Sequence, residues 1–297
     1  MLEVIGWRGF IDKKTLDVAD ENPKTTNEAW EAVAPAWDRN RDRIFETTRD
    51  ISERLVALVN PRPGQRVLEI AAGTGETGFL LAEMLGVDGW LLSTDFSSSM
   101  VEAARRGAAA RGLDHVECQV MDAQSIDLPD CTVDAVMARF GLMLVADPSR
   151  ALSEAYRVLR PGGRLAYAVW GMPDANPWIM LLALALLQSG HVLAGDPFGP
   201  GGLFSLAERE RNVQLVTAAG FTDIAVEELS GAMRVDDLED YWNFQASISG
   251  PIAVLLSGLT SDEHDEVRAA FRLTAEPYVR GTGYELPFRA LIVNAAR

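Results

Sequence analysis

Cysteine is scarce in this chain of 297 residues, which contains only Cys118 and Cys131. Neither belongs to a C-x-x-C pair, so the sequence does not support a disulfide framework or a cysteine-based zinc site. We therefore expect a reduced, cytoplasmic protein, and we predict no metal site. Histidine is almost as rare, with three residues in all.

Positive charge is also limited. The chain has three lysines, the last of them Lys24, and 24 arginines that face 43 acidic residues. A formal net charge of −16 opposes contact with a phosphate backbone, so we expect no nucleic-acid partner. The one basic run, 39–43, is interrupted by Asp42, and we interpret it as a solvated helix face. The lack of lysine after Lys24 excludes the Tyr-x-x-x-Lys pair of short-chain dehydrogenases.

Long apolar runs are missing as well. The longest, 179–187, has nine residues, which is too few to span a bilayer. Residues 1–10 lack the basic region and apolar core of a signal peptide. Trp7 and Phe10 make this N-terminal arm more apolar than a free tail. We expect the arm to dock on the rest of the chain or, in a homo-oligomer, on a second copy.

A glycine-rich turn is the most informative feature that the chain does contain. The apolar run 67–72 is typical of a buried parallel strand, and Gly73 and Gly75 follow it. A helix then begins, for which Thr77 or Thr74 is the expected cap. Free N–H groups and the positive end of a helix dipole favour an anionic group at such a turn. The segment therefore predicts a nucleotide-like cofactor.

Two cofactors compete for this turn. Gly73, Gly75 and Gly78 match the G-x-G-x-x-G pattern of dinucleotide sites, and Asp95 stands where a ribose-binding acid belongs. S-adenosylmethionine also needs that acid, and its amino-acid end adds an ammonium group. Glu69, four residues before Gly73, would suit the ammonium, whereas a pyrophosphate would gain nothing from it.

Strand and helix patterns alternate from residue 61 onward. The expected strands are 66–72, 90–94, 115–121, 133–138, 164–170, 222–229 and 284–295. Helices are expected over 27–60, from about 97 to 111 with Ser99 and Glu102 as a capping box, and over 147–159 and 207–219. These units predict an α/β fold with a doubly wound, mostly parallel seven-stranded sheet, whose last strand is antiparallel near the edge.

The same pattern divides the chain into segments around one core. The segments are an N-terminal arm and helical cap (1–60), a cofactor-binding core (61–170), a first insertion that covers the substrate (171–206), more of the core (207–229), a second helical insertion (230–283) and a final core strand (284–297).

Five motifs, in order and at suitable spacing, carry a family resemblance. They are VLEIAAGTG at 67–75, DFS at 95–97, MDA at 121–123, VDAV at 133–136 and EAYRVLRPGGRL at 154–165. The chain resembles the class I S-adenosylmethionine-dependent methyltransferases, and most of all the small-molecule group that includes the ubiquinone/menaquinone C-methyltransferases. The resemblance implies a Rossmann-like fold and S-adenosylmethionine as cofactor, with S-adenosylhomocysteine as product.

The resemblance also implies which residues meet the cofactor. Five residues would surround its methionine portion: Glu69, Ala71, Gly73, Thr74 and Gly75. Asp95 would bind the ribose hydroxyls, and the adenine would lie among Phe96, Met100, Asp122 and Ala123.

Three further residues are implied near the reacting centre, each with an alternative role. Arg139 and Phe140 would end the fourth strand next to the sulfonium, although Arg139 suits a structural ion pair equally well. Trp37 stands where related enzymes place an aromatic side chain that closes over the site, and a place in the core is its alternative.

The reaction implied is an in-line displacement at the sulfonium methyl, in which most of the catalysis is positioning. A phenol or an enol acceptor would benefit from a general base. His191 in the first insertion is the best candidate and Tyr241 in the second a weaker one, with a structural role as the alternative. Because no Asn-Pro-Pro-Tyr or Asp-Pro-Pro-Tyr follows the fourth strand, the usual motif for methylating adenine or glutamine is missing.

The insertions suggest an apolar acceptor. Their candidate lining residues are Trp170, Trp178, Met180, Phe198, Phe204, Trp242 and Phe244. We expect methylation at oxygen or carbon of a quinone, polyketide, terpenoid or similar small molecule, and the sequence leaves the accepting atom open. Two alternatives are a nicotinamide-dependent oxidoreductase on a Rossmann-like core and a non-catalytic scaffold of the same fold.

Overall fold

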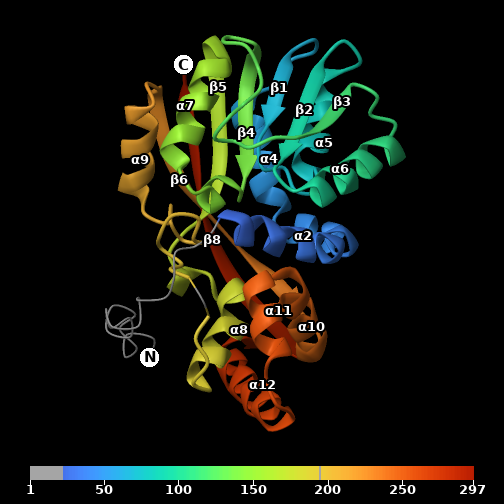
Figure 1. Ribbon diagram of the computed structural model, residues 1–297, viewed down its shortest axis with the longest axis vertical. Helices are drawn as coiled ribbons and strands as arrows, with labels where there is room; N and C mark the ends of the chain where they lie inside the picture. The colour runs from blue at the N-terminus through green and yellow to red at the C-terminus, as the bar shows by residue number, and fades with distance from the viewer. Residues whose placement is uncertain (1–22, 194) are drawn as a thin grey trace.

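The computed structural model describes residues 23–193 and 195–297. The N-terminal arm with Trp7 and Phe10, which we expected to dock, lies outside the described residues. Figure 1 shows a sheet with helices on its faces, and a layer of helices beyond one end of its strands.

Seven strands form the sheet in the order β3, β2, β1, β4, β5, β8 and β6. The first five pair in parallel, and β8 runs antiparallel between β5 and β6. The expected fold class is therefore confirmed, including the antiparallel strand near the edge. The bounds are β1 Arg66–Glu69, β2 Trp90–Asp95, β3 Val116–Val120, β4 Val133–Arg139, β5 Leu159–Trp170, β6 Thr222–Val235, β8 Gly283–Ala296 and, paired with β8 alone, β7 Val279–Arg280.

Helices cover both faces of the sheet because strands are added in opposite directions from β1. Strands β2 and β3 extend the sheet on one side of β1, and β4 and β5 extend it on the other. Right-handed crossovers from β1 to β3 place α5 and α6 on one face, and the return through β4 and β5 places α7 and α9 on the other. Helix α4 packs beside α5. The bounds are α4 Arg49–Val59, α5 Glu76–Leu85, α6 Ser98–Ala110, α7 Pro148–Val158 and α9 Arg209–Ala218.

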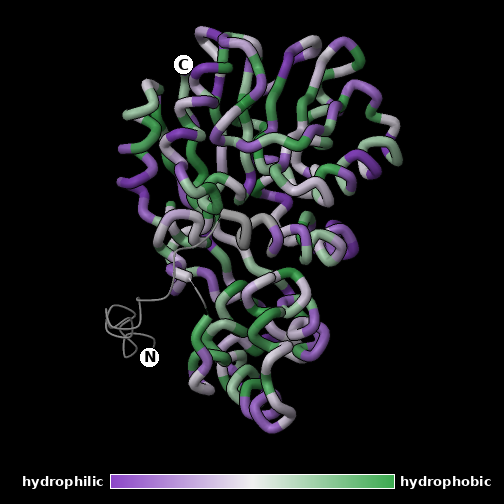
Figure 2. Tube along the Cα trace, viewed as in Figure 1, coloured by the Kyte–Doolittle hydropathy of each residue, from purple (hydrophilic) through white to green (hydrophobic). Residues whose placement is uncertain are grey.

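The remaining helices lie beyond the carboxyl ends of the parallel strands (Figure 1). Helix α2 lies between the sheet and this layer, where it contacts α6, α10 and α11. Figure 2 shows apolar residues both along the central strands and in the outer helical layer. The bounds are α2 Pro23–Arg39, α3 Arg41–Thr47, α8 Pro177–Gln188, α10 Leu238–Ile248, α11 Gly250–Ser257 and α12 Ser261–Ala275, with short 3-10 turns at Leu142–Leu144, Pro173–Ala175 and Glu276–Tyr278.

Strand β6 is six residues longer than the sequence predicted. It continues to Val235 because 230–235 pair antiparallel with 284–289 of β8. Met233 and Val235 are buried along this extension and Arg234 is exposed, as the two-residue period of a strand requires. The second insertion therefore begins after Val235, and the β6–β8 pair reaches from the sheet to the helical layer (Figure 1).

The predicted threonine cap of α5 and the predicted Ser99–Glu102 capping box of α6 are wrong, whereas the serine run 97–99 does supply the cap of α6. Helix α5 has Gly75 as its N-cap, in the left-handed conformation with no side-chain bond, and Thr77 instead shares a hydrogen bond with Ser52 at 2.9 Å. Helix α6 is capped by the Ser97 hydroxyl, which accepts from the Met100 N–H at 3.2 Å, and not by Ser99. Because β2 ends at Asp95, the chain already turns into the helix at Ser97.

The apolar helix α8 is packed against α12, α10 and β8. Leu181, Leu182, Ala185 and Leu186 are buried there, so this face is covered within the subunit. Asn176, at the start of α8, holds the helix to the sheet. Its amide donates to the Gly171 and Arg289 carbonyls, and its carbonyl accepts from the Arg289 N–H at 3.0 Å.

We predict that Asn176→Ala lowers the free energy of unfolding by about 3 kcal/mol, because it leaves several buried backbone groups unpaired. Urea unfolding followed by circular dichroism measures the change, with Asn243→Ala on the exposed side of α10 as control. Equal unfolding free energies for the two variants would show that Asn176 does not anchor α8.

Candidate functional site

Three candidate residues, Glu69, Asp95 and Arg139, meet at one edge of the sheet because the strands that carry them are parallel neighbours. Glu69 of β1 is in register with Ser93 of β2 and with Met137 of β4. The carboxyl ends of these strands therefore place the Gly73–Gly75 turn between Asp95 on one side and Arg139 on the other. This is the edge at which open α/β sheets bind ligands.

Unusual backbone conformations occur both in the turn after β1 and directly after β4. Gly73 and Gly75 have φ of 58° and 90°, which glycine adopts readily, but Ala71 has φ of 51° and Phe140 has φ of 58°. A Cβ atom on Gly141 would lie 2.2 Å from the Ala71 Cβ. Such conformations are costly for residues with a side chain and gather at ligand sites, so this observation supports a functional edge.

Asp95 is built into the turn. Its two carboxylate oxygens accept from the Gly73 N–H at 2.8 Å and from the Ser97 N–H at 2.9 Å. Burial raises the pKa of Asp95, and these two N–H groups counteract the rise. The carboxylate therefore has a fixed orientation beside the glycine turn and retains acceptor positions for hydroxyl donors.

Glu69 is almost completely buried, with 1% of its surface exposed. Burial raises its pKa to about 8, although the Ser93 hydroxyl, which donates to its Oε2 at 3.1 Å, and the charge of Arg139 oppose the rise. A Cβ atom on Gly78 would lie 2.1 Å from the same Oε2, so the third glycine of the turn makes room for this carboxyl group.

A second buried acid, Glu76, was missed by the sequence analysis. Its carboxylate accepts from the Thr74 hydroxyl, and Arg41 and Arg111 approach it at 3.4 and 4.0 Å. Arg41 also donates to the Ala103 carbonyl and pairs with Asp38. The interpretation of 39–43 as a solvated face is therefore wrong for Arg41, which joins the N-terminal helices to α5 and α6.

The residues expected to bind adenine follow β2 and β3, on the side of Asp95 that faces away from β1. Met100 and Ala123 are buried, Phe96 is half-buried, and Asp122 is exposed and accepts from the Gln124 N–H at 2.8 Å. Helix α2 borders this region through Glu31, which accepts from the Ser98 and Ser99 N–H groups at the start of α6. Glu31 was also missed, since nothing in the sequence links it to residues nearly 70 positions away.

Arg139 and Phe140 end β4 on the side away from Asp95. The Arg139 guanidinium donates to the Thr48 hydroxyl at 2.6 Å, and burial lowers its pKa despite the charges of Glu76 and Glu69. The Phe140 ring stacks on Trp170 with centroids 3.6 Å apart. Trp170 in turn contacts Trp178 and Phe288, so an aromatic cluster adjoins the guanidinium.

Comparison with known proteins identifies the family. A methyltransferase domain family matches residues 67–163. Demethylmenaquinone methyltransferase of Renibacterium salmoninarum is 30% identical over 223 residues, which are 72% of this chain and 91% of that protein. The chain is a class I S-adenosylmethionine-dependent methyltransferase.

A second sequence relative agrees with this assignment, and a solved structure shares the fold. The ubiquinone/menaquinone biosynthesis C-methyltransferase UbiE of a Marinomonas strain is 31% identical over 55% of this chain and 68% of its own length. The YcgJ protein of Bacillus subtilis has a similar fold, with a TM-score of 0.57 at 15% identity over 83% of this chain and 97% of its own. The methyltransferase uses S-adenosylmethionine as its cofactor, and the nicotinamide alternative is thereby set aside.

Trp37 of the methyltransferase lies in a contact between helices. Its indole N–H donates to the Ile248 carbonyl at the end of α10 at 2.9 Å, and its ring lies 5.7 Å from that of Trp30. The half-buried side chain thus joins α2 to the helical layer, which is the packing role that we weighed against a lid.

The two candidate bases are not brought to the strand edge. Tyr241 is fully buried, donates to the Trp178 carbonyl and accepts from Gln245, and burial raises its pKa further above neutrality. His191 follows the far end of α8, a helix of 12 residues that is about 18 Å long. Among the described residues its Nε2 is buried without a hydrogen-bond partner. A catalytic role for either residue stays a prediction that this arrangement does not favour.

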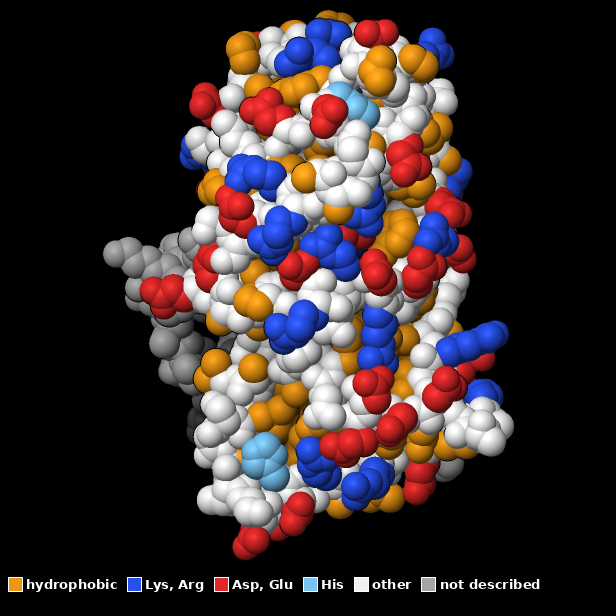
Figure 3. Space-filling view, turned by 90° about the vertical axis from the view of Figure 1, so that its right-hand side faces the viewer, with side chains coloured by type: hydrophobic (Ala, Val, Ile, Leu, Met, Phe, Trp, Pro, Cys, Tyr) orange, Lys and Arg blue, Asp and Glu red, His pale blue; other side chains and the backbone are white. Residues whose placement is uncertain are grey.

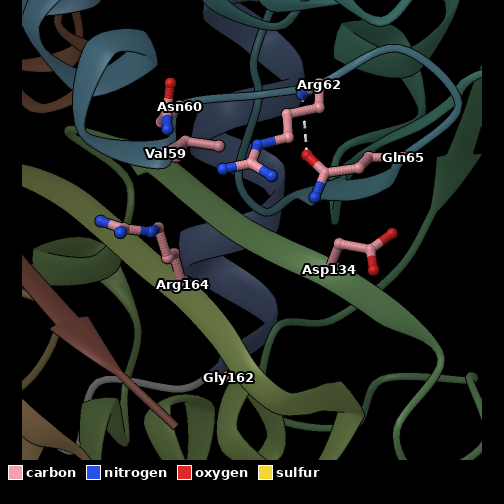
Figure 4. A pocket seen from close by; sticks show the side chains of 7 residues that line it. All are labelled: Val59, Asn60, Arg62, Gln65, Asp134, Gly162 and Arg164. Carbon is pink, nitrogen blue, oxygen red and sulfur yellow. Dashed lines mark hydrogen bonds between the residues drawn. The ribbon is translucent and has the colours of Figure 1, made fainter.

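Two hollows lie away from the candidate edge. One, of about 310 Å³, separates α2 from α10 and α11, and it is lined by Ala32, Val33, Pro35, Ala36, Arg39, Ala246, Ser247, Gly250, Ala253 and Val254. The other, of about 260 Å³, lies at the amino ends of β1, β4 and β5 (Figure 4). Figure 4 shows Arg62 and Arg164 near the end of α4, where a helix dipole itself favours cations. We therefore assign the second hollow no ligand.

The outer face over α6, α2 and α10 carries interspersed acidic and basic side chains (Figure 3). The ion pairs Arg106–Asp38 at 2.7 Å and Arg43–Asp240 at 2.8 Å join elements across it. In the described ranges no helix is long and apolar enough to cross a membrane. The same part of the chain contains no cluster of three or more His, Cys, Asp or Glu residues suited to a metal ion.

We predict that S-adenosylhomocysteine binding depends on pH through Glu69. Its raised pKa means that Glu69 is mostly protonated at pH 7 in the ligand-free enzyme, and an ammonium group beside it would favour ionisation. Affinity should therefore increase from about pH 6 to about pH 8, with a proton released on binding near pH 7.

Calorimetry in buffers of different ionisation enthalpy counts the released protons. Glu69→Gln should abolish the release, whereas the control Glu83→Gln, an exposed residue of α5, should retain it. The same release from Glu69→Gln as from the unchanged enzyme would exclude Glu69 as its source.

Proposed function

We propose that the enzyme transfers the methyl group of S-adenosylmethionine to an oxygen or a carbon atom of an apolar, planar small molecule of the quinol, polyketide or terpenoid type. The observation that carries the proposal is the aromatic cluster at the end of β4 and β5. Phe140 stacks on Trp170, and Trp178 and Phe288 lie behind it. Flat apolar rings favour a flat apolar partner.

A polar group within this cluster supports an acceptor that carries oxygen. The indole N–H of Trp178 is buried and has no hydrogen-bond partner among the described residues. An unpaired buried donor is costly, and a ligand oxygen would satisfy it. The names of the similar enzymes from Renibacterium and Marinomonas, which refer to quinone biosynthesis, agree with this substrate class.

The transfer would be an in-line displacement. A lone pair on the acceptor oxygen, or an enol carbon, forms the new bond to the methyl carbon while the carbon–sulfur bond breaks and the sulfur keeps its electron pair. The sulfonium becomes a neutral thioether, and a proton leaves the acceptor for solvent. Since neither His191 nor Tyr241 lies at the strand edge, the enzyme would act on an acceptor that ionises readily, and its own contribution would be positioning.

Within this proposal the strand-edge residues hold the cofactor. Asp95 would bind the ribose, Asp122 and Ala123 the adenine, and Glu69 with the Gly73–Gly75 turn the amino-acid end. The buried and hydrogen-bonded state of Asp95 and Glu69 fits these roles, because both carboxyl groups are preorganised at the turn. Glu76 would support the turn through Thr74.

We predict methyl transfer from radiolabelled S-adenosylmethionine to 2-prenyl-1,4-naphthoquinol and none to glycine. Phe140→Leu should raise KM for the naphthoquinol about three- to tenfold, because it removes a stacking face. Its affinity for S-adenosylhomocysteine should stay within about twofold of the original value.

The control for this assay is Leu273→Ala, on the exposed side of α12. Transfer to glycine with none to the naphthoquinol would contradict the proposed acceptor class. An unchanged KM in Phe140→Leu would remove the aromatic cluster as its basis.

A further inference from the structure

The buried acid Glu69 and the half-buried base Arg139 lie at the turn without an ion pair between them. Because Glu69 is in register with Met137, Arg139 projects from the same face of the sheet two residues further along β4. The two side chains are close enough for each to shift the pKa of the other. No ion pair joins them in the described part of the chain, although a pair of this kind gains most from direct contact.

Each charge is held in place by its own partner. The Glu69 carboxyl is fixed by the Ser93 hydroxyl and fits against Gly78, whose missing side chain gives it room. The Arg139 guanidinium is fixed by the hydroxyl of Thr48, which is itself buried and donates to the Ile44 carbonyl at 2.8 Å. The structure thus keeps the carboxyl and the guanidinium apart.

The position of Arg139 is unfavourable for a lone cation. Thr48 lies between α3 and α4 as the C-cap of the first and the N-cap of the second, so the opposite helix ends offset each other there. The Gly73–Gly75 turn begins α5 and presents a positive helix end. Of the two acids that influence its pKa, Glu76 has the larger effect, and the charge of Glu76 is shared with Arg41 and Arg111. A half-buried guanidinium that has one hydrogen bond among the described residues can bind a further anion with its remaining donors.

We propose that Arg139, oriented by Thr48, binds the carboxylate of the amino-acid end of S-adenosylmethionine, opposite the ammonium that Glu69 faces. A guanidinium and a carboxyl group held apart on one face match a zwitterion, which carries both charges on one carbon. The inference rests on the proposed cofactor site and adds the group that selects ligands with a carboxylate. It also gives a role to Arg139, which forms no ion pair among the described residues.

Ligands that differ only in this end provide the test. S-adenosylhomocysteine has the carboxylate, its decarboxylated analogue S-adenosyl-3-thiopropylamine lacks it, and 5′-methylthioadenosine lacks the whole amino-acid end. Titration calorimetry gives Kd for each ligand with the unchanged enzyme and with Arg139→Gln. The control is Arg164→Gln, an exposed arginine at the opposite edge of the sheet.

Arg139→Gln should weaken S-adenosylhomocysteine binding about thirtyfold, as expected for the loss of a charge-assisted pair, and leave the other two ligands within about twofold. Thr48→Val, which removes only the orienting hydroxyl, should weaken S-adenosylhomocysteine binding about fivefold with the same selectivity. This second variant also tests the proposal if Arg139→Gln does not fold.

Three results would overturn the inference. Equal losses for all three ligands would make Arg139 a structural residue. An unchanged Kd for S-adenosylhomocysteine in both variants would place the carboxylate elsewhere, while leaving the cofactor site itself intact. Absence of S-adenosylhomocysteine binding by the unchanged enzyme would refute the proposed cofactor site as well.

Discussion

The site depends on the parallel pairing of β1 with β2 and β4. This pairing places Glu69, Asp95 and Arg139 at one edge of the sheet. The glycine turn that connects β1 to α5 lies at the same edge. The backbone of the turn is held in place by the Asp95 carboxylate, which accepts hydrogen bonds from the Gly73 and Ser97 N–H groups. A slip of β1 by one residue would move Glu69 to the other face of the sheet, away from Arg139.

Buried charge at this edge is offset by interactions from outside the sheet. Thr48 belongs to the N-terminal helices, Arg41 reaches Glu76 from α3, and Glu31 reaches the start of α6 from α2. The N-terminal helices therefore complete the electrostatics of the site as well as covering it. They also join it to the helical layer, since Trp37 of α2 is bonded to the end of α10.

Local patterns in the sequence predicted most of the sheet and its edge. The apolar run before Gly73, the acids after β2 and β3 and the glycine spacing are short-range signals, and a parallel sheet converts them into one site. The β6 extension was missed because its pairing partner lies some 50 residues later. The same reason explains why the sequence did not indicate Glu31, Arg41 and Glu76. A charged residue on a helix is expected to face solvent unless its tertiary contacts are known. His191 was favoured because it follows the apolar helix of the first insertion, which we expected to cover the acceptor. The sequence does not show which end of that helix faces the strand edge.

We propose that S-adenosylmethionine binds at the carboxyl edge of the sheet through Asp95. Calorimetric titration with S-adenosylmethionine, comparing the unchanged enzyme with Asp95→Ala and with the exposed control Asp88→Ala, tests it most directly. We expect saturable binding by the unchanged enzyme and by Asp88→Ala. In Asp95→Ala the affinity for S-adenosylmethionine should fall about tenfold or more. Equal affinity in all three proteins would contradict the proposal.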